Sequence, residues 1–211
     1  MTKTVSIQGQ NFILHPAGVA FWHEKKMLLV SDVHLGKVTH FRKHGVAIPE
    51  NSVSGNFKQL KEVFDYFWPE TIIFLGDLFH SKKNSEWHLF EDFVLKTDAK
   101  MILVAGNHDV IDPKHYTDLN VAVCSEYTIG KFLLTHHPEI REGFFNFSGH
   151  IHPGIKLHGL GKQSLQLPCF FQKPDQMILP AFGEFTGKFF LVPTQHDCVY
   201  AIAKDEVIMI C

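Results

Sequence analysis

Carboxylate, amide and imidazole side chains recur in short clusters between residues 32 and 152 of this 211-residue chain. Together they suit borderline divalent ions such as manganese, iron, zinc, cobalt or nickel, whereas calcium and magnesium prefer all-oxygen shells. Seven such ligands, with one further histidine left over, are too many for one ion and suit two ions that share a bridging group. The sequence therefore predicts a dinuclear centre, with manganese as the expected metal and the other ions as alternatives. The ligands are Asp32, His34, Asp77, Asn107, His136, His150 and His152, and the histidine left over is His108.

The charge of such a centre indicates its substrate. Asp77 is the natural bridging ligand, because a carboxylate has lone pairs for two metals. Two divalent cations, less the charges of Asp32, Asp77 and one bridging hydroxide, leave a net charge of about +1. A site with this charge attracts a phosphate ester, so the residues predict phosphoester hydrolysis by two metal ions.

Composition excludes several other classes of protein. The 20 Lys+Arg and 22 Asp+Glu leave a formal charge of −2, so there is no overall attraction to nucleic acid or acidic lipid. An apolar content of 45% excludes intrinsic disorder. The four cysteines form no C-x-x-C pair, which fits a reducing compartment. Without a leader-like or membrane-length apolar segment, we expect a soluble, cytoplasmic protein that does not contact a membrane.

The polar clusters follow short apolar runs, at residues 27–30, 71–75, 101–105 and 132–134. Such runs are too short for helices and are typical of strands buried on both faces. Ligands of open α/β sheets gather beyond the carboxyl ends of strands, so the clusters should meet at one sheet edge. Asp32 and His34 are two residues apart, as are His150 and His152. On an extended segment, both members of each pair would project to the same side.

Other patterns predict the elements that surround these strands. Apolar residues at helical spacing predict helices over 53–67, capped by Asn51 or Ser52, and over 89–94, after Asn84-Ser85. Short strands at 121–124, 127–129, 165–167, 189–192 and 199–202 predict a β-rich second half that ends in a hairpin. We therefore expect one domain over residues 1–211 of the α/β (α+β) class. Its architecture should be a two-sheet β-sandwich flanked by helices, in an αββα arrangement.

The ordered motifs D-x-H, G-D, G-N-H-D, H and G-H-x-H resemble those of the calcineurin-like metallophosphoesterase superfamily. Further motifs are similar to the bacterial branch of ligase-associated DNA damage response endonucleases, PdeM. They are L-G-K at 35–37, G-D-L-F-H-S at 76–81, L-P-C-F at 167–170, L-P-A-F-G at 179–183 and F-T-G at 185–187.

The superfamily resemblance implies a role for each residue. One metal would be held by Asp32, His34, Asp77 and His152, and the other by Asp77, Asn107, His136 and His150. A bridging hydroxide would attack phosphorus in line, while His108 contacts the phosphate and protonates the leaving oxygen. The branch resemblance implies phosphodiester bonds in DNA as substrate, a role in DNA repair, and association with a DNA ligase, helicase or exonuclease.

Several assignments stay open. His137 is an alternative to His136 as ligand, although His136 lies closer to the strand end. The family often has an aspartate three residues after the Gly-Asp carboxylate, where this chain has His80. This histidine can touch substrate or lie at the surface, and its presence leaves open what orients His108. Asp109 is the nearest carboxylate in sequence.

The basic run beyond the first motif has two interpretations, a solvated helix face or a clamp for a phosphate backbone. Two other functions also stay open: hydrolysis of nucleotides or other small phosphoesters, and a catalytically inactive metal-binding scaffold. Retention of His108 beside every ligand position argues against the scaffold. The basic run consists of Lys37, His40, Arg42, Lys43 and His44.

Overall fold

The structure is a computed structural model that describes residues 1–37, 51–80, 82–84, 86–159, 163–183 and 186–210, with the backbone alone at 51–54. Arg42 and the rest of the basic run after Lys37 lie outside the described residues. The same holds for Ser85, which precedes the second predicted helix, and for Phe185 of the F-T-G motif.

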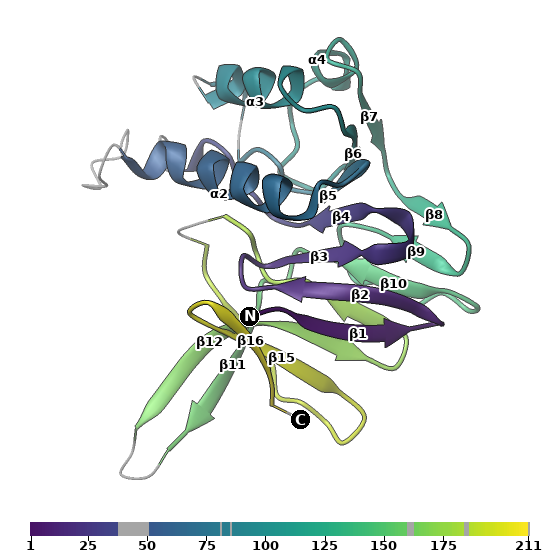
Figure 1. Cartoon of the computed structure of the whole chain (residues 1–211), viewed down its shortest axis with the longest axis vertical. Helices are drawn as coiled ribbons and strands as arrows, with labels where there is room; N and C mark the ends of the chain where they lie inside the picture. Colours follow the sequence, from purple (N-terminus) through teal and green to yellow (C-terminus); the bar gives the residue numbers. More distant parts are fainter. Residues whose placement is uncertain (38–50, 81, 85, 160–162, 184–185, 211) are drawn as a thin grey trace.

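The first sheet has seven strands whose spatial order is their order in the chain (Figure 1). The first four pair as antiparallel neighbours and the last four as parallel ones. Leu28 and Val30 point to one face, while Met27 and Leu29 point to the other. Both faces of the parallel strands are therefore buried, as their unbroken apolar runs predict. The strands are β1 (Lys3–Ile7), β2 (Gln10–His15), β3 (Val19–Trp22), β4 (Met27–Val30), β5 (Thr71–Leu75), β6 (Lys100–Val104) and β7 (Val121–Cys124).

The second sheet has nine strands and packs against the first through a shared apolar core. The order along it is β14-β11-β12-β13-β10-β9-β8, and β15 pairs with β12 and β16. The strands β9, β10 and β13 are parallel neighbours. The members are β8 (Tyr127–Ile129), β9 (Phe132–Leu134), β10 (Phe145–Ser148), β11 (Pro153–His158), β12 (Ser164–Lys173), β13 (Gln176–Ile178), β14 (Phe189–Phe190), β15 (Cys198–Ala203) and β16 (Glu206–Met209).

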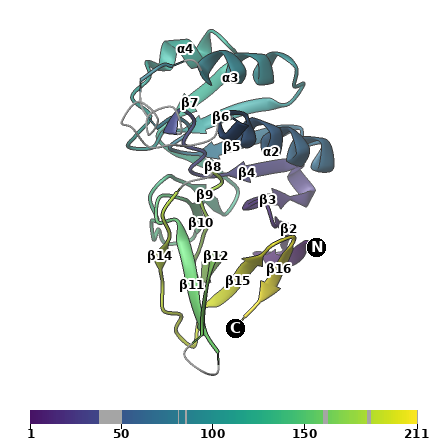
Figure 2. The same cartoon turned by 90° about the vertical axis from the view of Figure 1, so that its left-hand side faces the viewer.

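The helices α2 (Asn51–Phe67), α3 (Glu86–Leu95) and α4 (Pro113–Thr117) lie near β4–β7 (Figures 1 and 2). They pack through Leu60, Phe90 and Tyr116 against the face of the first sheet that points away from the second sheet. A 3-10 turn, His23–Lys25, joins β3 to β4. The apolar cluster on the outer face of the second sheet includes no residue of a described helix.

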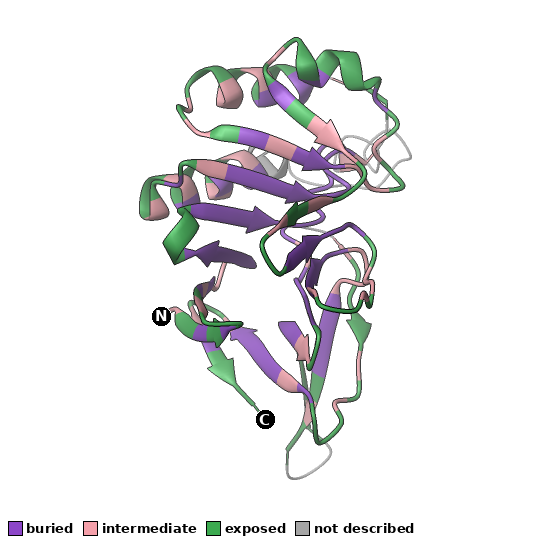
Figure 3. Cartoon of the chain, turned by 90° about the vertical axis from the view of Figure 1, so that its right-hand side faces the viewer, coloured by how far each residue is buried: buried purple, intermediate pink, exposed green. Residues whose placement is uncertain are grey.

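The expected α/β fold with two sheets is confirmed, and Figure 3 shows that its strands are largely buried. The strand expected over 189–192 is shorter, Phe189–Phe190. The sequence did not predict β1–β3, β10, β11, β13 or α4. Within the described ranges, Cys124, Cys169 and Cys198 form no disulfide. None of the helices described is long and apolar enough to cross a membrane.

Candidate metal centre

The predicted polar clusters meet where the parallel strands of both sheets end. Beyond β4 and β5 the two chain segments stay paired through backbone hydrogen bonds, because the His34 N–H donates to the Asp77 carbonyl (2.9 Å) and the Leu35 N–H to the Leu78 carbonyl (2.8 Å). From the second sheet, the Gly149 N–H donates to the His136 carbonyl (3.0 Å), which joins the loops after β9 and β10. The expectation of a site at the carboxyl ends of the strands is thereby met.

Five of the predicted ligands have a left-handed backbone. Their φ angles are 52° at Asp32, 50° at His34, 50° at Asp77, 65° at His150 and 51° at His152. The expectation that each D-x-H or H-x-H pair lies on an extended segment is therefore wrong. Left-handed φ is uncommon for residues other than glycine and costs about 1–3 kcal/mol at each position. Side chains reach the centre because the tertiary structure holds these turns, and not because a straight strand projects them to one side.

One group of candidate ligands joins the two sheets. His152 Nε2 lies 3.2 Å from Asp32 Oδ1 and 3.4 Å from His34 Nε2. Asp77 Oδ2 lies 4.0 Å from His34 Nε2. Asp32, His34 and Asp77 are buried, and Asp32 Oδ1 has no hydrogen-bond partner in the part of the chain that the structure describes. A buried carboxylate oxygen without a donor is suited to bind a cation.

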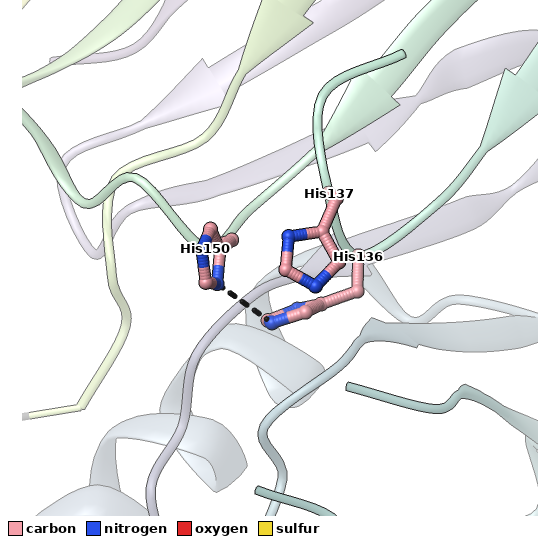
Figure 4. Close-up of side chains that lie close together, drawn as sticks. All are labelled: His136, His137 and His150. Atoms are coloured by element: carbon pink, nitrogen blue, oxygen red, sulfur yellow. Dashed lines mark hydrogen bonds between the residues drawn. The ribbon is translucent and has the colours of Figure 1, made fainter. Parts of the chain in front are cut away.

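A second group surrounds His136. Its Nδ1 donates to the Leu75 carbonyl (2.9 Å), so Nε2 keeps a lone pair. That nitrogen lies 3.0 Å from Asn107 Oδ1, 3.5 Å from Asp77 Oδ1 and 3.1 Å from His150 Nδ1, the contact dashed in Figure 4. Neither Asn107 Oδ1 nor Asp77 Oδ1 carries a hydrogen, so these two acceptors face the lone pair of His136 Nε2 without a proton between them.

These separations fit ions bound between the atoms. Metal–ligand distances of about 2.0–2.2 Å place neighbouring ligand atoms of one ion roughly 3.0–3.5 Å apart. The acceptor pairs around His136 Nε2 lie in that range, and a cation between them converts their repulsion into attraction. Three groups have all their ligand atoms within 4.8 Å of one another: Asp32/His34/His152, Asp32/Asp77/His136 and His136/His137/His150.

The electrostatic environment keeps the ligands in their binding forms. Burial, together with the charge of Lys37, lowers the pKa of His34 to about 3, so its imidazole is neutral near pH 7. Burial would raise the pKa of Asp32, but the neighbouring imidazoles, His152 foremost, outweigh it and hold the pKa below its ordinary value. Burial also lowers the pKa of His150. Neutral imidazoles and an ionised carboxylate are the species that bind metal.

Asp109 holds two of the ligand-bearing loops together. Its Oδ2 accepts the N–H groups of Asp77 (2.8 Å) and Gly106 (2.8 Å), and its Oδ1 accepts those of Leu78 (2.9 Å) and Phe79 (3.3 Å). Burial raises the pKa of Asp109 to about 6, although hydrogen bonds from the N–H groups of Gly106, Phe79 and Asp77 act to lower it. The carboxylate that was a candidate to orient His108 thus binds backbone amides of the loops after β5 and β6.

Close packing leaves no room for side chains at two glycines of the site. A Cβ at Gly106 would lie 2.3 Å from Asp77 Oδ1, and one at Gly149 would lie 2.4 Å from Asp32 Oδ2. Each glycine therefore lets a neighbouring loop approach a carboxylate that the sequence predicts as a ligand. The G-N-H-D and G-H-x-H motifs contain these glycines. The structure shows why glycine is needed there: a side chain would collide with a carboxylate of the site.

The remaining predicted residues lie around this centre. His108 is exposed, and its ring centroid lies 5.4 Å from that of His80 in a stacked arrangement and 5.9 Å from that of His34. His137 is also exposed, with its ring 4.0 Å from that of His150 (Figure 4). Lys37 is half-buried, and its pKa is lowered by burial against the carboxylates of the site. Every predicted site residue that the structure describes is therefore close to the centre.

Sequence reasoning missed a structural role of the L-P-A-F-G motif. The N–H groups of Phe182 and Gly183 donate to the carbonyls of Ser31 (2.9 Å) and Asp32 (3.0 Å), so this segment packs directly behind the first ligand. The motif itself was visible, but only the fold shows what it touches.

Comparison with known proteins places this geometry in context. A family model of calcineurin-like phosphoesterases matches residues 25–168. Among solved structures, the chain is similar to a Pseudomonas putida nuclease, MPE, with a TM-score of 0.83 and 26% identity over 99% of this chain and 100% of that chain. A protein of unknown function from Aquifex aeolicus has a TM-score of 0.43 and 21% identity over 60% of this chain and 78% of its own. The phosphoesterase Yfce from E. coli has a TM-score of 0.42 and 14% identity over 87% and 97%. No curated protein matches the sequence.

Proposed function

The chain belongs to the calcineurin-like phosphoesterase family and is a phosphoester hydrolase, and from this premise we propose that it is a two-metal phosphodiesterase that cleaves DNA. The dependence on metal is supported by the acceptor atoms around His136 Nε2: Asn107 Oδ1 and Asp77 Oδ1 both face its lone pair, an arrangement that a cation would stabilise. Similarity over 99% of the chain to a structure named as a nuclease supports a nucleic-acid substrate. The L-G-K, G-D-L-F-H-S and F-T-G motifs, through their resemblance to the DNA endonuclease branch, favour DNA.

We assign the two ions to the two groups of side chains around Asp77. Asp32, His34 and His152 would hold one ion, and Asn107, His136 and His150 the other, with Asp77 between them. His136 is preferred to His137 because it is buried and its Nε2 faces three other candidate ligand atoms. The mixed oxygen and nitrogen donors favour manganese or another borderline ion.

When bound, such ions polarise a phosphoryl oxygen and lower the pKa of water. The chain's own residues supply the rest of the mechanism. His108 lies at the exposed edge of the centre, beside His34, where its imidazole can give a proton to the leaving oxygen. The ring of His80 stacks against that of His108, where it would help to orient the His108 imidazole. Lys37 adds a positive charge beside the carboxylates and favours an anionic substrate.

A comparison of two substrates tests the proposal. With Mn²⁺, the protein should nick supercoiled plasmid and hydrolyse bis-p-nitrophenyl phosphate. The His108→Ala variant should lose roughly 10²- to 10⁴-fold in nicking, the usual contribution of a general acid. It should lose less on the nitrophenyl ester, because nitrophenolate leaves without a proton. The exposed His23, on the turn between β3 and β4, provides a matched control as His23→Ala.

Each negative result has a defined meaning. Plasmid left intact by a protein that hydrolyses the nitrophenyl ester would refute DNA as substrate and favour a small phosphoester. Absence of turnover with every divalent ion would refute the catalytic centre and favour a metal-binding scaffold. Metal analysis of His108→Ala should show the wild-type metal content, because this residue is assigned to the proton and not to an ion.

A further inference from the structure

A cleft of about 210 Å³ opens beside the candidate ligand His152. It lies between the start of β11, the middle of β12, and the described residues of 181–183 and 186–188. None of the functions proposed above uses this cleft. Its lining residues are His152, Pro153, Pro168, Ala181, Gly183, Thr186, Gly187 and Lys188.

One wall of the cleft is fastened to the metal centre. Ser31 Oγ donates to the Pro180 carbonyl (3.1 Å), and the Gly183 N–H donates to the Asp32 carbonyl (3.0 Å). The cleft therefore keeps a set position relative to the first candidate ligand. A group bound in it would lie next to a phosphate at the metal centre.

The opposite wall places one lysine in the cleft. The Phe189 N–H donates to the His152 carbonyl (3.0 Å), and the Leu191 N–H to the Gly154 carbonyl (3.1 Å). These bonds continue the parallel pairing of β14 with β11, which run side by side in Figure 2. Lys188 comes directly before β14, so its backbone is held at the cleft beside His152.

The chemistry of the lining favours an anion. None of the described lining residues is a carboxylate, and Glu184, between Gly183 and Thr186, lies outside the described residues. Lys188 is exposed, with no acidic side chain of the described residues within 4.0 Å. Thr186 Oγ1 donates to the Gly183 carbonyl (2.9 Å) and keeps lone pairs free. By contrast, the cleft between α2 and α3 has Asp65 and Asp92 in its lining.

The size of the cleft limits what it can hold. Its 210 Å³ equals about seven water molecules at roughly 30 Å³ each. Pockets for whole drug-sized ligands begin at about 300 Å³. A single phosphate with part of its sugar therefore fits, whereas a complete dinucleotide does not.

We propose that this cleft binds a non-scissile phosphate of a nucleic-acid strand, next to the phosphodiester at the metal centre, with Lys188 neutralising its charge. This inference rests on the proposed function and adds a strand-binding subsite to it. It predicts that the enzyme prefers substrates with a second phosphate, a preference that a single-phosphate ester cannot show.

Substrates of increasing length test the subsite. With Mn²⁺, wild-type kcat/KM should be higher for the trinucleotide TpTpT than for the dinucleotide TpT, because only the trinucleotide has a second phosphate. Lys188→Ala should lose about fivefold in kcat/KM on TpTpT, as expected for an exposed ion pair. It should keep its rates on TpT and on bis-p-nitrophenyl phosphate. Lys188→Arg, which keeps the charge, should restore the preference for the trinucleotide.

The matched control is Lys25→Ala. Lys25 is also exposed and lines another cleft without carboxylates, of about 270 Å³, that lies at the start of β4 and not at its carboxyl end. Binding of a fluorescein-labelled oligothymidylate, followed by anisotropy at several salt concentrations, gives a readout independent of turnover. Lys188→Ala should reduce the slope of log affinity against log salt by about 0.7, and Lys25→Ala should leave it unchanged.

The outcomes separate this inference from the proposed function. Equal kcat/KM for TpT and TpTpT, or equal behaviour of the two lysine variants, would overturn the subsite while leaving a nuclease intact. If the protein hydrolyses only the nitrophenyl ester, the DNA substrate fails. The anisotropy data then decide the subsite: weaker binding by Lys188→Ala alone supports it, and equal binding by both variants removes it.

Discussion

Asp109→Asn tests how the two ligand-bearing loops after β5 and β6 are held together. In the wild type, each carboxylate oxygen of Asp109 accepts two backbone N–H groups, from Asp77 and Gly106 on one side and from Leu78 and Phe79 on the other. An asparagine amide has one oxygen and one NH₂ group. Whichever way the amide turns, its NH₂ group faces two backbone donors and leaves them without an acceptor.

The expected loss follows from those two donors. Each buried N–H group without an acceptor costs about 1–3 kcal/mol, so the free energy of unfolding should fall by roughly 2–6 kcal/mol. For a protein of this size, about 2–4 °C of Tm is lost per kcal/mol, which gives a decrease of roughly 4–24 °C. The Asp77 loop should also shift, so the rise in Tm caused by Mn²⁺ should be smaller than in the wild type.

Differential scanning calorimetry, with EDTA and then with Mn²⁺, measures both effects. Asp112→Asn is the matched control, because Asp112 accepts the Lys114 N–H (2.9 Å) at the start of α4, where asparagine caps a helix equally well. If Asp109→Asn unfolds within about 1 kcal/mol of the wild type and gains the same Tm from Mn²⁺, the carboxylate does not hold the loops, and the reasoning is refuted.

Three further predictions concern the ligands and the pH dependence of stability. His136→Ala should remove one of the two proposed ions in metal analysis, whereas the exposed His137→Ala should retain both; the reverse result would exchange their roles. Gly149→Ala places a methyl group 2.4 Å from Asp32 Oδ2 and should weaken Mn²⁺ binding by about 10- to 100-fold in calorimetric titration, and unchanged affinity would contradict the close packing. Burial lowers the pKa of His15 below its ordinary value of 6.5, so the unfolded chain binds the extra proton more readily. The free energy of unfolding should therefore fall as pH drops below about 6.5. His15→Gln should flatten this fall in urea titrations, and identical profiles would exclude His15 as its source.

The buried parallel strands were predictable because their periodicity is local. β4 and β5 are unbroken apolar runs that stop at polar residues, and a strand buried on both faces requires that pattern. The strands β10 and β13 were not predicted. Each is a short segment of four or three residues that contains a buried polar side chain, Asn146 or Gln176, so neither shows a continuous apolar run. Asn146 is satisfied there by the Leu133 carbonyl and Thr135 Oγ1, contacts that only the folded sheet provides.

The sequence by itself determined which side chains gather at the centre, because their types are typical of metal ligands and each cluster follows a strand. Only the tertiary structure decided how they reach it. Asp32, His34 and Asp77 have left-handed backbones that no local preference selects, and these are held by hydrogen bonds from distant segments such as Gly183 to Asp32. The tertiary structure also supports His136 over His137 as the proposed ligand, since the His136 ring is buried and its Nδ1 donates to the Leu75 carbonyl. The local sequence fixes which side chains can act as ligands. The direction in which each side chain presents its lone pair depends on contacts between residues far apart in the chain.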